Sequence, residues 1–133
     1  MDSKVRVMYV EADEQVLESM AAALRTEFQV WVARSAEAGV AVGDELGFDA
    51  DILVVDLDAG AGMSGREFIT EYRRRAQRDV PVVVTGAGRP YEAAQSVTAS
   101  TYLPKPYSAV ELLRVLRLLA HRMRRSQAPR KDE

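Results

Sequence analysis

The chain contains 133 residues, of which 47% are hydrophobic and none is cysteine, and its formal net charge at pH 7 is -2. This length suits one domain, the charge gives no electrostatic reason to expect nucleic-acid or anionic-membrane binding, and the lack of cysteine excludes disulfides and thiolate zinc sites. Because the chain shows no signal-peptide core and no run of ~20 apolar residues, we expect a cytoplasmic domain with neither nucleic-acid nor membrane partners.

Short apolar runs rich in branched residues predict five β-strands. The first covers residues 5–10 and is followed by three acids within four residues. The third, residues 51–55, contains four consecutive apolar residues and is followed by Asp56, a pattern typical of a strand buried on both faces of a parallel sheet. The other predicted strands cover residues 28–32, 79–85 and 100–103.

Helix start signals stand between the predicted strands. Side-chain oxygens at these positions can accept hydrogen bonds from the first backbone N–H groups of a helix, and a glutamate three residues on completes a capping box. The signals are Asp13, Ser35, the pair Ser64–Glu67 and the pair Ser108–Glu111. Two glycines, Gly39 and Gly43, weaken the second predicted helix.

Strands and helices alternate along the chain, which predicts an α/β domain with a parallel sheet covered on both faces. A short helix over about residues 91–97 separates the last two strands, and the last helix is expected to end near Arg124. We expect one domain over residues 1–125 and a polar, disordered tail over residues 126–133.

Polar side chains follow four of the predicted strands. They are Glu11 and Asp13 after the first, Asp56 and Asp58 after the third, Thr85 at the end of the fourth, and Lys105 after the fifth. Because ligands bind outside the carboxyl ends of strands in open α/β sheets, we expect these side chains to converge. Carboxylates suit Mg²⁺, and a carboxylate beside that ion can accept a phosphoryl group, with a lysine and a hydroxyl holding the transferred oxygens.

These residues, together with Tyr102 and the dipeptide Lys105-Pro106, resemble the receiver domain of two-component response regulators over essentially the whole chain. The resemblance implies a flavodoxin-like, doubly wound, five-stranded parallel sheet of order 2-1-3-4-5. It also implies that Asp56 accepts a phosphoryl group from the phosphohistidine of a histidine kinase or of a phosphotransfer protein.

The resemblance also implies roles for the residues around Asp56. Lys105 would pair with the phosphoryl group or with Asp56, and Lys105-Pro106 would be a cis peptide, which occurs at only ~5–6% of X-Pro bonds. Thr85 and Tyr102 would form a switch pair, in which the hydroxyl moves to the phosphate and the ring turns inward. The domain would be a phosphoacceptor with self-phosphotransfer and autodephosphorylation only, not an enzyme with an external substrate.

The metal ligands implied by the resemblance are Glu11, Asp13, Asp56 and the backbone carbonyl of Asp58, holding Mg²⁺. The chain departs from the family pattern here, because Ala12 stands where the second of two adjacent acids is usual. The loop from Asp56 to the glycine of the next helix also lacks a proline and is one residue longer than usual. These departures leave a second function open, that of a degenerate receiver that docks proteins without phosphorylation.

We expect a stand-alone receiver without an output domain, acting on a separate downstream protein. The last predicted helix has more apolar residues than one buried stripe needs, namely Val110, Leu112, Leu113, Val115, Leu116, Leu118 and Leu119. The surplus predicts either a partner or homodimer surface around the fourth helix, fifth strand and last helix, or packing under the fourth helix.

A literal G-x-G-x-x-G lies at Gly60, Gly62 and Gly65. Such a motif can bind a dinucleotide when it forms a tight strand–turn–helix. Here the first glycine follows Asp56 by four residues, and the next predicted strand ends in Thr85 instead of the ribose-binding acid. A loop is therefore the better interpretation, and a nucleotide-binding flavodoxin-like protein is the third and weakest alternative.

Overall fold

The computed structural model describes residues 4–58, 62–87 and 90–127, and all structural statements concern these residues. Five strands alternate with five helices. The strands are β1 (Arg6–Val10), β2 (Gln29–Ala33), β3 (Ile52–Asp56), β4 (Val82–Gly86) and β5 (Thr101–Pro104). The helices are α1 (Glu14–Leu24), α2 (Ala36–Leu46), α3 (Gly65–Ala76), α4 (Pro90–Ser96) and α5 (Ala109–Gln127). The predicted alternation is therefore confirmed, with small shifts at the strand ends.

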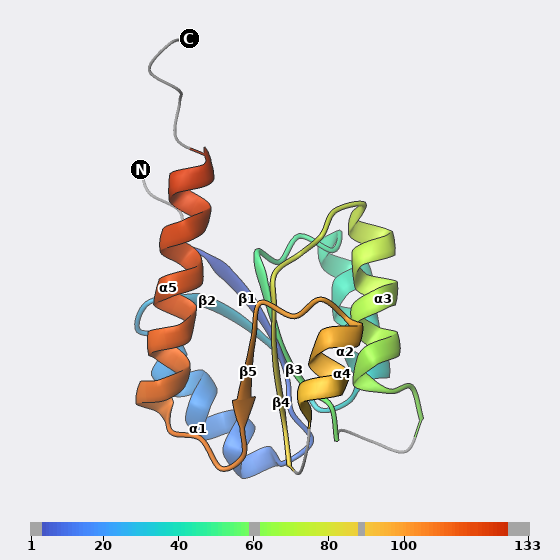
Figure 1. Cartoon of the computed structure of the whole chain (residues 1–133), viewed down its shortest axis with the longest axis horizontal. Helices are drawn as coiled ribbons and strands as arrows, with labels where there is room; N and C mark the ends of the chain where they lie inside the picture. The colour runs from blue at the N-terminus through green and yellow to red at the C-terminus, as the bar shows by residue number, and fades with distance from the viewer. Residues whose placement is uncertain (1–3, 59–61, 88–89, 128–133) are drawn as a thin grey trace, which may run out of the picture.

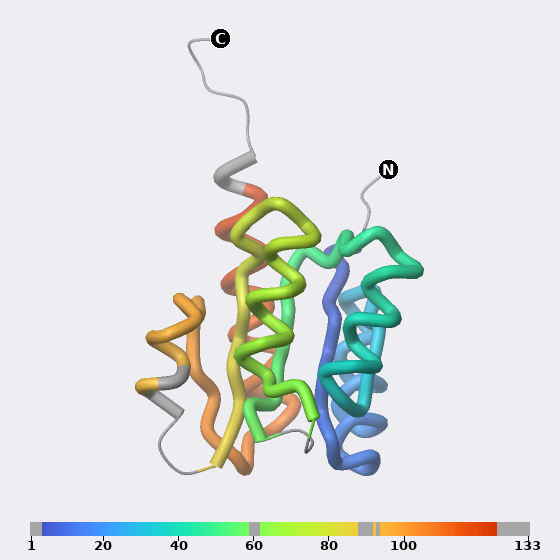
Figure 2. Tube along the Cα trace, turned by 90° about the vertical axis from the view of Figure 1, so that its right-hand side faces the viewer, coloured from blue at the N-terminus to red at the C-terminus, as the bar shows by residue number. Residues whose placement is uncertain are grey.

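All strand pairs are parallel, and the sheet order is β2-β1-β3-β4-β5, which confirms the predicted flavodoxin-like topology. Helices α1 and α5 cover one face of the sheet, and α2, α3 and α4 cover the other (Figure 1). The view turned by 90° shows the central strands between these two helical layers (Figure 2).

The core consists of two hydrophobic clusters, one on each face of the sheet. In β1, Val7 and Tyr9 belong to the cluster under α1 and α5, whereas Met8 and Val10 belong to the cluster under α2, α3 and α4. This alternation follows from the two-residue period of a strand. The central strand β3 is buried along its whole length, as its unbroken apolar run predicted.

The glycines of α2 allow close packing against aromatic rings. A Cβ on Gly39 would lie 2.7 Å from a ring carbon of Phe68, and one on Gly43 would lie 2.6 Å from a ring carbon of Phe48. The two positions are buried, so the low helix propensity of glycine is offset by tertiary contact. The second helix therefore forms over the predicted range.

The four predicted caps are present. Asp13 and Ser35 cap α1 and α2, and Ser64 forms a complete capping box with Glu67 at α3. Ser108 exchanges hydrogen bonds with Glu111 at α5 in the same way.

The end of α5 differs from the prediction. The helix continues to Gln127, so the predicted start of the tail at residue 126 was two residues too early. The chain contains no glycine or proline between Ala109 and Pro129, and basic residues suit the negative end of the helix dipole. Residues 128–133 of the predicted tail lie outside the described residues. No helix in the described part of the chain is long and apolar enough to span a membrane.

Candidate functional site

The predicted strand ends meet at one edge of the sheet. Asp56 is the last residue of β3 and lies beside Thr85 of β4 in the strand register. Glu11 directly follows β1, and its backbone N–H donates to Ala33 O at 3.0 Å. The N–H of Lys105 donates to Gly86 O at 3.0 Å, which holds the residue after β5 against β4. The sheet thus brings together the four side chains that sequence spacing placed on separate strands.

Glu11, Asp56 and Lys105 form an ion-pair cluster, called here the acid–lysine cluster. Lys105 Nζ lies 2.9 Å from Asp56 Oδ2 and 3.5 Å from Glu11 Oε1. Both acidic side chains are 1% exposed, whereas the lysine side chain is 27% exposed. One partly accessible ammonium thus faces two buried carboxylates, and the cluster carries a formal charge of -1 when all three groups are ionised.

Backbone N–H groups complete the surroundings of the two carboxylates. Asp58 N donates to Asp56 Oδ1 at 2.9 Å, and Ala12 N lies 3.5 Å from Asp56 Oδ2. Asp13 N donates to Glu11 Oε2 at 2.9 Å. These donors orient both carboxylates at the strand ends, as buried polar groups require.

Burial and charge shift the pKa values within the acid–lysine cluster. Desolvation raises the pKa of Glu11, and the charge of Asp56 adds to that rise against the opposing effects of the Asp13 N–H and Lys105. Desolvation lowers the pKa of Lys105, but the hydrogen bond and charge of Asp56, together with Glu11, outweigh it and raise the pKa above its ordinary value. Lys105 therefore remains an ammonium at neutral pH.

The other two predicted acids are used differently. Asp13 Oδ1 accepts from Gln15 N at 3.0 Å and from Val16 N at 3.1 Å, so its carboxylate caps α1. Asp58 Oδ2 accepts from Ala87 N at 2.8 Å and joins the segment after β3 to the one after β4. The described residues contain no group of three or more acids, histidines or cysteines arranged to hold a metal. The metal-ligand roles predicted for Asp13 and for the backbone carbonyl of Asp58 stay predictions.

Two buried oxygens suit a group that would enter the site. Among the described residues, Glu11 Oε1 and Thr85 Oγ1 are buried side-chain oxygens that lack a hydrogen-bond partner. Mg²⁺ needs only one or two protein carboxylates when phosphate oxygens and water supply the rest. Glu11 and Asp56 meet that minimum without Asp13, so the donor set fits Mg²⁺ together with a phosphoryl group.

Two further predictions concern β5 and the segment after it. The Lys105-Pro106 peptide is cis, as predicted. Tyr102 is half-buried and lines a surface groove with Ala94 and Thr98 at the end of α4. The ring of Tyr102 thus lies between β5 and α4, and its switch role stays a prediction.

Gly65, the first residue of α3, has a contact that motif reading did not reveal. A Cβ there would lie 3.1 Å from the backbone oxygen of Asp56 and from Leu57 Cα. The start of α3 can approach the end of β3 this closely because residue 65 has no side chain. The first glycine of the G-x-G-x-x-G motif, Gly60, lies outside the described residues.

A second pair of residues was missed as well. The hydroxyls of Tyr9 and Tyr107, 98 positions apart in the chain, form a buried hydrogen bond. Desolvation raises the pKa of Tyr107 to about 12 and also raises that of Tyr9, so both are neutral at physiological pH. The available signal was the position of Tyr9 in a strand buried on both faces, because a buried tyrosine hydroxyl usually needs a partner.

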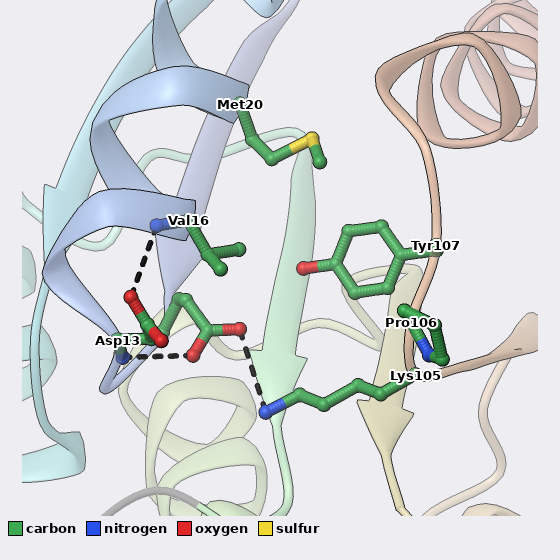
Figure 3. A pocket seen from close by; sticks show the side chains of 7 residues that line it. Asp13, Val16, Met20, Lys105, Pro106 and Tyr107 are labelled. Carbon is green, nitrogen blue, oxygen red and sulfur yellow. Dashed lines mark hydrogen bonds and ion pairs between the residues drawn. The ribbon is translucent and has the colours of Figure 1, made fainter.

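A cavity of about 380 Å³ adjoins the acid–lysine cluster. It lies between α1 and the segment after β5, and Figure 3 shows Tyr107 and Lys105 extending into it from that segment. Its lining includes apolar side chains from α1, Val16 and Met20, and Glu11 at the end of β1. Two members of the cluster, Glu11 and Lys105, therefore border this cavity.

Comparison with known proteins gives relatives by sequence and by fold. No family model matches the chain. The sensory transduction protein RegX3 of Mycobacterium tuberculosis strain H37Rv, and that of Mycobacterium bovis, is 36% identical over 121 residues, covering 87% of this chain and 51% of the relative. The chain thus spans about half the length of the curated relatives it matches.

Solved structures share the fold. A response regulator receiver domain protein from Clostridium thermocellum superposes with a TM-score of 0.78 at 18% identity, over 90% of this chain and 97% of that one. The chemotaxis protein CheY4 of Vibrio cholerae superposes with a TM-score of 0.77 at 19% identity, over 88% and 99% of the two chains. At these identities the likeness concerns the fold.

Proposed function

Because this chain belongs to the receiver domains of two-component response regulators, we propose that Asp56 accepts a phosphoryl group from a phosphohistidine. The phosphohistidine would be that of a histidine kinase or of a phosphotransfer protein. The observation that carries the proposal is the acid–lysine cluster: a buried aspartate at the end of β3, 2.9 Å from a lysine ammonium. In the proposed role an Asp56 oxygen is the nucleophile, and the ammonium at this distance would bind the phosphoryl oxygens.

The proposed transfer uses groups already in place. An Asp56 carboxylate oxygen bonds to phosphorus as the phosphorus–nitrogen bond of the phosphohistidine breaks, and the leaving imidazole retains the electron pair and takes up a proton from water. Lys105 balances the negative charge of the phosphoryl oxygens, and the unpartnered Thr85 hydroxyl donates a hydrogen bond to one of them. Later attack of water on phosphorus would release phosphate and restore the carboxylate.

Glu11 and Asp56, with the backbone carbonyl of Asp58, would hold Mg²⁺, which when bound supplies positive charge to the phosphoryl oxygens. We propose no activity toward other substrates, so that self-phosphotransfer and autodephosphorylation are the whole of the chemistry. The site thus acts as a phosphoacceptor in signalling.

The proposed output is a change in affinity for a downstream protein at α4, β5 and α5. The movement of the Thr85 hydroxyl toward the phosphoryl group would free the space into which Tyr102 turns. On α5, Val110 is 61% exposed and Leu118 is 52% exposed, whereas Leu112 and Leu116 are buried in the cluster with α1. Exposed apolar side chains of this kind suit a protein partner or a second copy of the chain.

A second function is favoured by Ala12, whose methyl group supplies no metal ligand at the end of β1. If the two carboxylates of the acid–lysine cluster bind Mg²⁺ too weakly, the chain would act as a docking module that needs no phosphoryl group. In that case Lys105 would serve mainly to neutralise two buried acids.

The test is phosphorylation by acetyl phosphate with and without millimolar Mg²⁺, measured as acid-labile phosphate on the wild type, on Asp56→Asn and on Asp44→Asn. Asp44 is an exposed acid of α2 and serves as the matched control. Phosphate on the wild type and on Asp44→Asn, but not on Asp56→Asn, would support the assignment. Label that persists on Asp56→Asn would refute it, and a wild type without label at saturating donor and metal would favour the docking module.

A further inference from the structure

The Tyr9–Tyr107 pair joins two distant parts of the fold beside the acid–lysine cluster. Tyr9 lies on β1, between β2 and β3 in the sheet, and is 0% exposed, whereas Tyr107 lies two residues after Lys105 and is 9% exposed. The hydroxyl–hydroxyl hydrogen bond links the segment after β5 directly to β1, in addition to the ion pair between Lys105 and Glu11. The proposed phosphoryl transfer assigns no role to either tyrosine.

Apart from the ion pairs of its ammonium, Lys105 is held by its backbone. Its N–H bonds to Gly86 O, and the next residue, Pro106, is exposed and has no N–H to donate. The first cap of α5 comes only at Ser108. Between those two anchors, Tyr107 is the one buried side chain of the segment.

The cavity beside Tyr107 makes this anchor important. Val16 and Met20 line the cavity opposite the ring, so that side of Tyr107 is not filled by close packing. A ring next to open space can change rotamer unless another contact restrains it. The bond to Tyr9 supplies that restraint, because breaking it would leave a hydroxyl unpaired within an apolar cluster, which costs free energy.

We propose that the Tyr9–Tyr107 hydroxyl pair is a positioning device for Lys105, fixing the segment after β5 to β1 and thereby the ammonium between Glu11 and Asp56. The consequence for the rate of phosphorylation rests on the proposed function; the positioning itself does not. Both tyrosines act through Lys105 and touch no reacting atom.

The test compares Tyr107→Phe, Tyr9→Phe and the double variant, with Tyr72→Phe as the matched control. The Tyr72→Phe variant also loses a buried hydroxyl, which accepts a hydrogen bond from Ala50 N at 3.0 Å. Tyr72, however, lies in the cluster on the opposite face of the sheet. The first readout is the hydrogen exchange rate of the Lys105 ammonium, observed by NMR on protein with labelled lysine. The chain has only three lysines, so the signal can be assigned with Lys105→Met. The second readout is the rate of phosphorylation by acetyl phosphate.

Each single variant at the pair is expected to raise ammonium exchange roughly three- to tenfold and to slow phosphorylation by a similar factor, because Lys105 is displaced from its carboxylates. Tyr72→Phe is expected to lose stability without either change. The double variant removes both hydroxyls, leaves none unpaired and should recover stability, yet its Lys105 should remain loose. A purely structural role would instead restore Lys105 together with stability.

Unchanged ammonium exchange in Tyr107→Phe, an equal change in Tyr72→Phe, or recovery of Lys105 in the double variant would each overturn the proposal. If the wild type takes no phosphate while the ammonium exchange behaves as expected, the phosphoacceptor function fails and the positioning stands. The two proposals are therefore tested separately.

Discussion

Replacing Lys105 with methionine should reveal the energetic role of the acid–lysine cluster. The change keeps the length of the side chain but leaves Glu11 and Asp56, each 1% exposed, without their shared cation. Removing one partner of a fully buried ion pair costs about 3–5 kcal/mol, whereas an exposed pair contributes about 0–1 kcal/mol. Because Lys105 is 27% exposed, we expect a loss of about 2–3 kcal/mol in the free energy of unfolding at pH 7.

The loss should depend on pH in a defined direction. Burial already raises the pKa of Glu11, and Lys105 opposes that rise, so the variant should raise it further. An acid whose pKa is higher in the folded state destabilises the fold as pH rises, and this penalty vanishes below its unfolded value of about 4.3. The variant should therefore approach the stability of the wild type near pH 4 and differ most from it at neutral pH.

The assay is urea unfolding at pH 4 and at pH 7, followed by the fluorescence of Trp31, the single tryptophan, which is half-buried on β2. Lys4→Met is the matched control, because Lys4 is exposed and its ammonium donates to the backbone oxygen Arg25 O at 3.3 Å. The control should change stability by less than about 0.5 kcal/mol. An equal deficit for Lys105→Met at both pH values would show that lost packing, not unpaired carboxylates, causes the effect and would refute the reasoning.

Three further predictions concern the scaffold, each checked by urea unfolding. Gly39→Ala should destabilise the fold by about 1–2 kcal/mol, since the new Cβ overlaps the Phe68 ring and overpacking outweighs the gain in helix propensity; a gain in stability would contradict this. Ser64→Ala should cost about 1 kcal/mol through loss of the α3 capping box, and no change would mean that the box is dispensable. Tyr72→Phe should cost about 1–3 kcal/mol by leaving the buried Ala50 N–H unpaired, whereas a loss below about 0.5 kcal/mol would imply that the N–H finds another acceptor.

Local sequence signals were sufficient for most of the fold. The strand–helix alternation, the four caps and the buried strand β3 all depend on residues within a few positions of one another, and each was confirmed. The end of α5 was placed too early, because polarity was taken as a stop signal although no glycine or proline stands between Ala109 and Pro129.

Part of the site could also be predicted from the sequence, and part could not. The residues at strand ends could be named from the sequence because a parallel sheet aligns the carboxyl ends of its strands at one edge, so Glu11, Asp56, Thr85 and Lys105 converge as expected. The sequence allowed Asp13 both a cap and a metal-ligand role, because the two require the same residue type at almost the same position, and the metal role stays a prediction. The structure shows its carboxylate at the cap.

The sequence by itself thus determined the order of the elements and the set of polar groups at the sheet edge, because both follow from short-range periodicity and from the alignment of parallel strands. Only the tertiary structure decided that one ammonium lies between two buried carboxylates, that Gly65 allows α3 to approach Asp56, and that Tyr9 meets Tyr107 across 98 positions. Those facts depend on distances of a few ångströms between segments far apart in the chain, and such distances arise from packing, which local pattern does not encode.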